Sequence, residues 1–344
     1  MERRGRKPVT VTHGLATPEE AAALIRAGRV LVLAGTAADL ATLPHGQWIG
    51  GTAASFLTQA GGREANGRLF YSDLSAVARS VRLRHLSLPE LRQIGRLHPA
   101  NGFTLLIVPG FSQLLAGLCA GIMDYEGIYN APLFGWVSAV APYNLSKYRP
   151  QSFAGGPAGA SELAAVMSVS LPDELFAEIH IANLFNPGVG PEIRFPKPGF
   201  VAEGACQIGG ETGNLAQYME AKGIDQRLPL VADHDGALIN LSILASDPHG
   251  GTTTFLAPVD PGLTYRFAEP VLDYPEELDR ALVQLPRDAS GLSSVCLQNY
   301  LHGRLRQAIG LPCQGPVSFG QIAYNVLNQT LACLRIGAVA EDET

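Results

Sequence analysis

The fold is decided by PANGFTLLIVPGFSQLLAGLCAGIM, residues 99–123, a stretch without a single charged residue. It is long enough to cross a bilayer as one helix. However, Pro109-Gly110 divides it into a run of strand-forming residues, Phe103–Val108, and a helical run, Gln113–Met123. A buried strand that leads into a packed helix needs no charge either. The stretch therefore predicts a strand, a turn and a helix, with no membrane span.

The same order of elements occurs earlier in the chain. A buried strand, a short helical segment and a second strand are again followed by glycine. The two copies run from Val30–Ala34 to Gly50-Gly51-Thr52, and from Thr104–Val108 to Gly135. We expect both glycine segments to be turns at equivalent strand ends. A repeated strand-helix-strand unit is typical of α/β proteins, so the N-terminal half is predicted to contain two related units.

Two helix starts are visible in the first hundred residues. Thr17-Pro18-Glu19-Glu20 supplies a capping hydroxyl, a proline at the first helical position and a glutamate that completes a capping box. Ser87-Leu88-Pro89-Glu90 repeats the pattern. Gly28 is expected to end the first of these helices.

The second half of the sequence is rich in predicted strands. Asp235-Gly236 is a hairpin signal before the apolar run Ala237–Leu244, and Val201–Ile208 is a further strand. A Gly/Pro/Ala-rich connection precedes this half, at 155–161. We therefore expect an α/β to α+β protein of mixed sheets, with an α/β domain at 1–170 and a β-rich domain at 171–344.

The composition is apolar, with 47% hydrophobic and 16% charged residues among 344. A thick, multilayered interior explains this, and a homo-oligomer interface is the second explanation. The five cysteines show no CxxC spacing, which suits a reducing compartment. Because no apolar segment follows the charged N-terminus, no export signal is evident and a cytoplasmic location is expected.

Charge is unevenly distributed along the chain. Residues 1–100 contain 13 Lys and Arg against 7 Asp and Glu, whereas the net charge of the whole chain is −6. Aromatic residues are not interleaved with the basic ones, which argues against nucleic-acid binding. A solvated face beside an acidic neighbour explains the asymmetry.

Three sequence features are candidates for ligand, metal or pocket chemistry. Backbone N–H groups of Gly50-Gly51-Thr52 could line an anion site, but a tight turn at the strand end is the favoured interpretation. Asp233-His234-Asp235 places three metal-ligand types together, but consecutive residues rarely close a metal site, and none is predicted. Tyr218, Tyr265, Arg266 and Tyr274 could line a pocket, and half-buried packing is the alternative.

Cys296 is the best candidate nucleophile, and His302 or Asp233 is the candidate residue that would assist it in catalysis. A nearby imidazole would lower the pKa of the thiol, as thiolate chemistry requires. Six residues of strand separate two side chains by roughly 20 Å, so His302 would reach Cys296 only if the chain folded back. A buried, inert cysteine is the competing interpretation.

The last thirty residues place polar side chains directly against an apolar strand. Gln321, Asn328 and Gln329 flank Leu331–Ile336, and polar groups buried there need a fixed partner or a ligand. Two parts of the chain resemble the FIST family. The terminal elements of that family are similar to Phe319-Gly320-Gln321-Ile322 and Asn328-Gln329-Thr330, and its opening segments are similar to Leu31–Thr52 and Leu105–Gly135. The chain thus resembles a divergent FIST protein with N- and C-terminal modules and no output domain.

The resemblance implies a bacterial sensory protein that binds a small ligand, with haem as one cofactor known in the family and a separate signalling protein as partner. Two positions depart from the family, because Gln321 replaces its usual glutamate and Leu327 its usual histidine. We therefore expect a small-molecule-binding protein whose site, between two domains, includes Gly50, Gly51, Thr52, Gly135, Gln321, Asn328 and Gln329. A cysteine-dependent enzyme and a scaffold for a partner protein are the alternatives.

Overall fold

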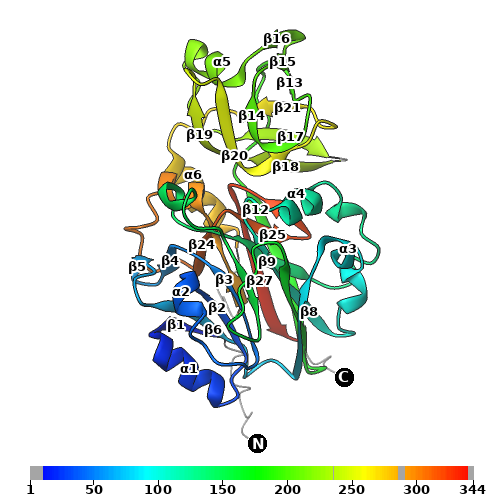
Figure 1. Ribbon diagram of the computed structural model, residues 1–344, viewed down its shortest axis with the longest axis vertical. Coiled ribbons are helices and arrows are strands. Elements are labelled where there is room, and N and C mark those ends of the chain that lie inside the picture. Colours follow the sequence, from blue (N-terminus) through cyan, green and yellow to red (C-terminus); the bar gives the residue numbers. More distant parts are fainter. Residues whose placement is uncertain (1–10, 235, 286–290, 340–344) are drawn as a thin grey trace, which may run out of the picture.

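The computed structural model describes residues 11–234, 236–285 and 291–339. It is a mixed α/β structure with 41% strand and 18% helix, which confirms the predicted strand-rich fold class. Figure 1 shows a larger body with a smaller unit above it. We call the upper unit, residues 193–267, the cap, and the described residues 11–183 and 274–339 the body.

Two large sheets form the body. The first has the strand order β1-β6-β2-β3-β10 and comprises β1 (Thr12–Ala16), β6 (Leu69–Asp73), β2 (Leu31–Gly35), β3 (Trp48–Thr52) and β10 (Ser152–Ala154). The second has the order β26-β25-β9-β8-β11-β7 and comprises β26 (Asn325–Leu327), β25 (Gly320–Ala323), β9 (Leu133–Ser138), β8 (Gly102–Pro109), β11 (Ala164–Ser170) and β7 (Ser80–Leu86). Within these sheets β2 pairs in parallel with β3, and β8 in parallel with β9. The two predicted strand-helix-strand units are confirmed.

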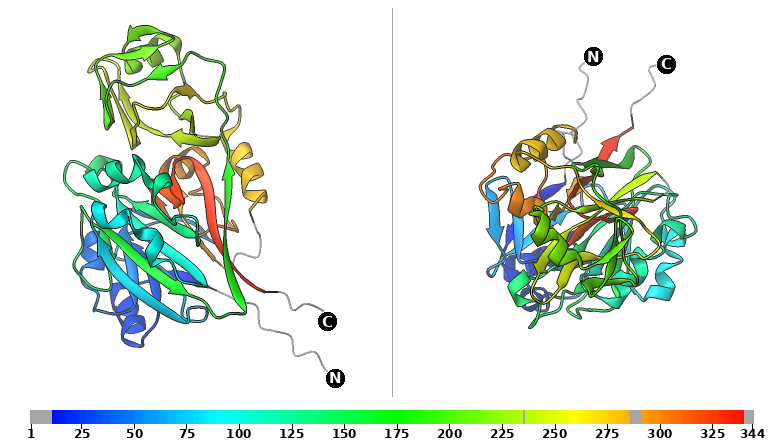
Figure 2. Two further views of the ribbon diagram at one scale, coloured as in Figure 1. Left: turned by 90° about the vertical axis from the view of Figure 1, so that its right-hand side faces the viewer. Right: turned by 90° about the horizontal axis from the view of Figure 1, so that it is seen from above.

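The two sheets pack face to face, and helices cover their outer faces (Figures 1 and 2). Val32 and Ile49 of the first sheet share a core with Leu105 and Ile107 of the second. On the outside of the first sheet lie α1 (Pro18–Arg26) and α2 (Ala37–Leu40). On the outside of the second lie α3 (Leu88–Leu91) and α4 (Gln113–Cys119). Because strand residues alternate between faces, each sheet buries one face on its partner and the other on helices.

Capping residues, glycine and proline determine where these helices begin and end, as predicted. Thr17 caps α1, its Oγ1 accepting from Glu20 N at 3.2 Å while Glu20 Oε2 accepts from Thr17 N at 2.7 Å. The chain leaves α1 through Gly28, whose φ of +77° is the left-handed conformation that glycine adopts without strain. Pro109 ends β8 and α4 begins four residues later, so residues 99–123 form the predicted strand, turn and helix.

Strands from the C-terminal part complete the body. Two smaller sheets contain β12 (Leu175–Asn183), β27 (Thr330–Ala338), β22 (Gly291–Ser293), β23 (Val295–Cys296), β24 (Gly315–Ser318), β4 (Ser55–Thr58) and β5 (Gly61–Glu64). Gly320 of β25 pairs with Val137 of β9, and Gly315 of β24 pairs with Leu57 of β4. Strands from both sides of residue 170 therefore share sheets, and the expected division into 1–170 and 171–344 does not separate them.

The cap is inserted between β12 and α6 (Tyr274–Val283), and its described residues form two sheets and one helix. These are β16-β15-β13-β21-β17-β18 and β14-β20-β19, with α5 (Leu215–Lys222). The strands are β13 (Ile193–Arg194), β14 (Gly199–Glu203), β15 (Cys206–Ile208), β16 (Glu211–Gly213), β17 (Leu230–His234), β18 (Ala237–Leu241), β19 (Ile243–Asp247), β20 (Thr252–Val259) and β21 (Tyr265–Phe267). The outgoing and returning connections bond to each other, Glu269 N donating to Asn186 O at 2.9 Å.

Two strands predicted as continuous are broken in the cap. The run at 201–208 divides into β14 and β15 at Gly204, whose φ is +79°. The run at 237–244 divides into β18 and β19 at Ser242. Asp235 of the predicted hairpin turn lies outside the described residues, but the strands on either side pair antiparallel, with His234 opposite Ala237.

No helix within residues 11–234, 236–285 and 291–339 combines the length and the apolarity needed to cross a membrane.

Candidate functional site between cap and body

A cavity of about 300 Å³ lies where the cap meets the body. Its floor is the end of α4, the following short helix η2 (Ile122–Asp124), and β26. Its roof comes from β17, β18, the end of β20 and the loop to β21. In Figure 1 α4 lies directly beneath these strands of the cap. A volume near 300 Å³ is at the lower end of the range for small-molecule pockets.

The polar groups of this cleft come from both parts of the molecule. Asp124 and Asn325 belong to the body, and Asn240, Asp260 and Tyr265 to the cap. Tyr265 is buried, and its phenol oxygen accepts a hydrogen bond from Asp260 N at 2.8 Å. Burial raises the pKa of Tyr265 to about 12, so the phenol stays protonated and keeps its own hydrogen to donate. Of the four candidate pocket residues named from sequence, Tyr265 lines this cleft.

Cys119, at the end of α4, also lines the cleft. Burial raises the pKa of its thiol to about 12, and the negative charge of Asp260 adds to the rise. A thiol with so high a pKa is almost entirely protonated at neutral pH, and the thiol form is a poor nucleophile. Cys119 therefore contributes apolar surface to the cleft rather than reactivity.

Next to the cleft, buried hydrogen bonds hold the cap on the body. Ser242 Oγ donates to Gln329 Oε1 at 2.7 Å, and Gln329 Nε2 donates to Tyr274 OH and to Arg227 O, both at 2.9 Å. Tyr274 OH donates in turn to Asn299 Oδ1 at 2.8 Å. Arg227 and Ser242 belong to the cap and the other three to the body. We call these five residues the latch.

Asn240 connects the cleft to residues beside the latch. Its Nδ2 lies within hydrogen-bond distance of Asn183 Oδ1, Asn328 O and Thr330 Oγ1, at 2.7, 3.2 and 3.4 Å. Its side chain is 2% exposed, and its Oδ1 has no hydrogen-bond partner in the structure. One end of this amide is therefore committed to the body, while the other end is an unfilled acceptor on a residue that lines the cleft.

The expected ligand residues of the C-terminal stretch lie beside this cleft rather than in it. Asn328 Nδ2 donates to Phe319 O at 2.9 Å, and its Oδ1 accepts from Ser242 N at 3.4 Å. Gln329, with a φ of +45°, is a latch residue. The polar groups of Asn328 and Gln329 are thus satisfied by fixed protein partners, which was one of the two outcomes expected for them.

Gln321 is completely buried in β25. Its Nε2 donates to Ser294 O and to Ala332 O, the latter at 3.2 Å. Leu327 is its direct partner across the β25–β26 pair. The two positions that depart from the FIST pattern are therefore neighbours on the same face of one hairpin.

The glycine candidates are strand residues, so the prediction that they form turns at strand ends is wrong. Gly50, Gly51 and Thr52 lie within β3, and Gly135 lies within β9. A Cβ on Gly135 would collide with Leu106 O of the neighbouring strand, and one on Gly51 would lie 2.6 Å from Ile107 Cγ2 of the facing sheet. These glycines allow close approach of strands and sheets, and Thr52 Oγ1 accepts from Gln151 N at 3.0 Å.

Cys296 and His302 lie at opposite ends of one short helix. Cys296 is the N-cap of α7 (Leu297–His302), and His302 is its last residue, about 9 Å further along the axis. His302 packs its ring against that of Tyr274, with centroids 5.6 Å apart. Burial, helped by the positive charge of Arg227, lowers the pKa of His302. The described contacts do not pair this imidazole with the thiol.

Cys296 itself is completely buried. Burial raises the pKa of its thiol, although the N–H groups of Gln329, Gln298 and Asn299 and the hydroxyl of Ser242 oppose that rise. A buried thiol with a raised pKa has the properties of an inert packing residue. This environment supports the competing interpretation of Cys296 more than the nucleophile.

The candidate metal residues serve a turn. Asp233 Oδ1 accepts from Gly236 N at 2.7 Å, His234 lines the cleft, and Asp235 lies outside the described residues. Among the residues that the structure describes, no three His, Cys, Asp or Glu side chains are grouped as a metal site would need.

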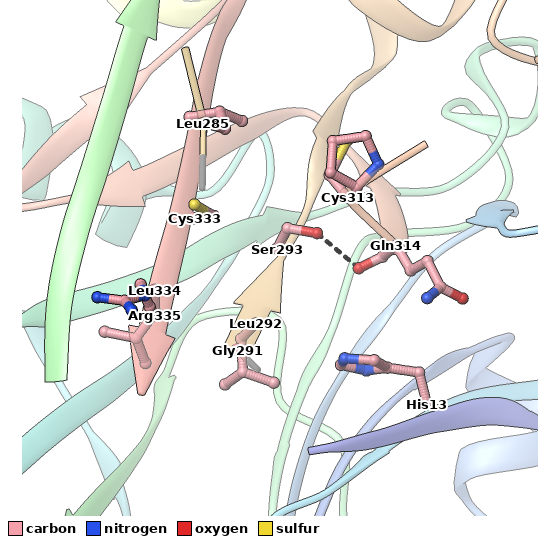
Figure 3. A pocket seen from close by; sticks show the side chains of 11 residues that line it. His13, Leu285, Gly291, Leu292, Ser293, Cys313, Gln314, Cys333, Leu334 and Arg335 are labelled. Carbon is pink, nitrogen blue, oxygen red and sulfur yellow. Dashed lines mark hydrogen bonds between the residues drawn. The ribbon is translucent and has the colours of Figure 1, made fainter. Parts of the chain in front are cut away.

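A second, much smaller cavity lies within the body (Figure 3). Its volume of about 30 Å³ suits one or two water molecules rather than an organic ligand. His13, Cys313 and Cys333 line it, and Ser293 Oγ donates to Gln314 O at 2.7 Å. Burial raises the pKa of Cys313 to about 12 and that of Cys333 to about 11, so neither thiol is activated.

Sequence reasoning missed most residues of the cleft. Asn240 and Ser242 carried a signal, because they interrupt an otherwise apolar run at alternate positions and so share one face. Asp124, Asp260 and Asn325 carried none, since single polar residues in loops are common on any surface. These three residues line one cavity only because the cap folds over α4 and β26.

Fold and cleft together define a class of protein, a four-layer α/β body with a strand-rich cap and a compact cavity between them. The chain belongs to DUF6976, a family of unknown function, which it matches over residues 16–337. No curated protein and no solved structure matches the chain.

Proposed function

We propose that this protein binds a small molecule in the cleft between cap and body, and that it acts as a sensory or regulatory protein. The observation that carries the proposal is Asn240. It lines a cavity of about 300 Å³, leaves one buried acceptor unfilled, and bonds on its other side to the connection that carries the latch residue Gln329. A ligand in this cavity would contact the cap at Asn240 and the body at the floor of the cavity, and so would favour one arrangement of the two parts.

The resemblance to FIST modules supports the sensory part of this proposal. Such a role would require a separate output partner, and we include a homo-oligomer and a cytoplasmic location in the proposal. The free state of all five cysteines agrees with a reducing compartment. His234 and Cys119 line the cleft and are residue types that can ligate haem iron. The small volume of the cavity favours a ligand more compact than a tetrapyrrole.

The proposal is tested by a thermal-shift screen of small metabolites, because a molecule that binds only the native state raises the melting temperature. Ala120→Phe would fill the cleft from the exposed end of α4 with little effect on the core. Ala23→Phe, on the exposed face of α1, is the matched control. We expect at least one compound to stabilise the wild type and Ala23→Phe but not Ala120→Phe.

Two results would contradict the proposal. One is a library that spans cations, anions, neutral compounds and haem and contains no stabilising compound. The other is a set of hits that stabilise Ala120→Phe as much as the wild type, since their site would then lie elsewhere.

A further inference from the structure

The charged side chains of the cleft are acidic. Asp124 contributes a carboxylate from the body, and Asp260 contributes one from the cap. Among the described residues that line the cavity there is no Lys or Arg, and His234 is the one histidine. A cavity lined by charges of one sign, with apolar walls around them, concentrates the opposite charge.

Asp260 lies near groups on both walls of the cleft. Its negative charge adds to the burial that raises the pKa of both Cys119 and Tyr265. Cys119 belongs to the body and Tyr265 to the cap. The Asp260 carboxylate therefore acts on groups from both walls of the cavity, as it would act on a ligand between them.

Asn240, which lines the cleft, also has a buried acceptor without a partner. Asn240 Nδ2 faces three oxygen atoms, those of Asn183, Asn328 and Thr330, so exchanging the amide nitrogen and oxygen would place oxygen against oxygen. This fixes Oδ1 as the atom without a partner. A ligand that satisfies it must bring an N–H or O–H donor, and a carboxylate or phosphate cannot.

The remaining walls are apolar. Ile122 and Val326 of the body and Leu241, Val259 and Leu263 of the cap line the cavity. A ligand with hydrocarbon surface gains about 25 cal/mol for each Å² that it removes from water there. The cleft therefore combines acidic and acceptor groups with a hydrophobic lining.

We propose that the ligand of this cleft is an organic ammonium compound with an apolar body and no carboxylate. The inference rests on the proposed function and narrows it to one chemical class. The ammonium group would lie near Asp260 and donate to Asn240 Oδ1, while the apolar body would pack between Val326 and Leu263. An amino acid would bring a carboxylate for which the described lining provides no Lys or Arg.

Four probes of similar shape test this class: phenethylamine, 2-phenylethanol, phenylalanine and phenylacetate. Each is titrated by calorimetry into the full chain. A hydrogen bond to a charged group contributes about 1.5–3 kcal/mol, so phenethylamine is expected to bind at least about tenfold more tightly than 2-phenylethanol. Phenylalanine and phenylacetate are expected to bind more weakly than the alcohol.

Asp260→Asn identifies the carboxylate responsible. The variant keeps the Oδ1 that accepts from Gly262 N at 2.7 Å, so the turn after β20 is preserved. We expect the variant to bind phenethylamine roughly ten- to a hundredfold more weakly and to bind 2-phenylethanol with unchanged affinity. Asp173→Asn, which removes an exposed carboxylate between β11 and β12, is the matched control and should change neither.

The proposal would be overturned if 2-phenylethanol, phenylalanine or phenylacetate bound as tightly as phenethylamine or more tightly. It would also be overturned if phenethylamine did not bind at its highest soluble concentration. An unchanged phenethylamine affinity in Asp260→Asn would do the same. The proposed function would survive these results if a compound of another class stabilised the wild type but not Ala120→Phe. The proposed function would fail together with this inference only if no compound of any class stabilised the wild type selectively over Ala120→Phe.

Discussion

At the residue scale, Gln321 shows how one buried side chain depends on being an amide. Its Nε2 donates to two main-chain carbonyls, those of Ser294 and Ala332. An ionised glutamate has no donor to offer and would place negative oxygen against these carbonyls. The glutamine was visible in the sequence, but its consequence was not, because Ser294 lies between β22 and β23 and Ala332 lies on β27.

Gln321→Glu is therefore expected to destabilise the protein by about 3 kcal/mol near neutral pH, because without a compensating cation the carboxyl group must take up a proton to be buried. The carboxyl group would remain neutral in the folded state and have a raised pKa there. The stability of the variant relative to the wild type would then be highest below the ordinary glutamate pKa of about 4.3 and would fall as the pH rises above it. Urea unfolding at several pH values measures this, and a variant as stable as the wild type at neutral pH would refute it.

A matched control and a partner substitution sharpen this test. Gln217→Glu, exposed in the first turn of α5, should change stability by no more than about 0.5 kcal/mol. Leu327 lies directly opposite Gln321. Leu327→His combined with Gln321→Glu should therefore be more stable than the sum of the two single changes predicts, by about 1 kcal/mol, because a cation would then face the carboxylate.

At the scale of elements, the duplicated strand-helix-strand unit could be predicted from sequence because its signals are local. Apolar runs, a proline with glycine and capping residues all act within one element. The role of its glycines could not be predicted, because that depends on the next strand. Gly50 lies opposite Leu33 and Gly135 opposite Leu106, so the two units use glycine at corresponding places.

The two glycines should nevertheless differ in their tolerance of a side chain. A Cβ on Gly135 would collide with the carbonyl of Leu106, whereas one on Gly50 would lie 3.1 Å from the carbonyl of Leu33. We expect Gly135→Ala to destabilise the protein by about 3 kcal/mol or to prevent folding, and Gly50→Ala by about 1 kcal/mol. The melting temperatures of the two variants show which substitution destabilises the protein more. The reverse order would show that the glycines act through something other than strand spacing.

At the scale of the whole molecule, the cap is held over the body by contacts between distant parts of the sequence. Ser242 and Gln329 are 87 residues apart along the chain, and Asn240 and Thr330 are 90 apart. The sequence showed that the C-terminal polar residues need partners or a ligand. It could not supply the partners, since they come from the cap. For the same reason the cleft could be expected between two parts of the protein while most of its lining residues could not.

Ser242→Ala tests whether the latch controls the opening of the cleft. The change removes the donor to Gln329 Oε1 and leaves a buried acceptor unsatisfied, which costs about 1–3 kcal/mol. Because the lost bond joins cap to body, hydrogen exchange should accelerate in the cap and in α6 and stay unchanged in β8, at the centre of the body. Ser246→Ala, within the cap but outside the latch, should leave both unchanged. If exchange accelerated equally in β8, cap and body would unfold as one unit, and a ligand in the cleft could then stabilise the protein without moving one part against the other.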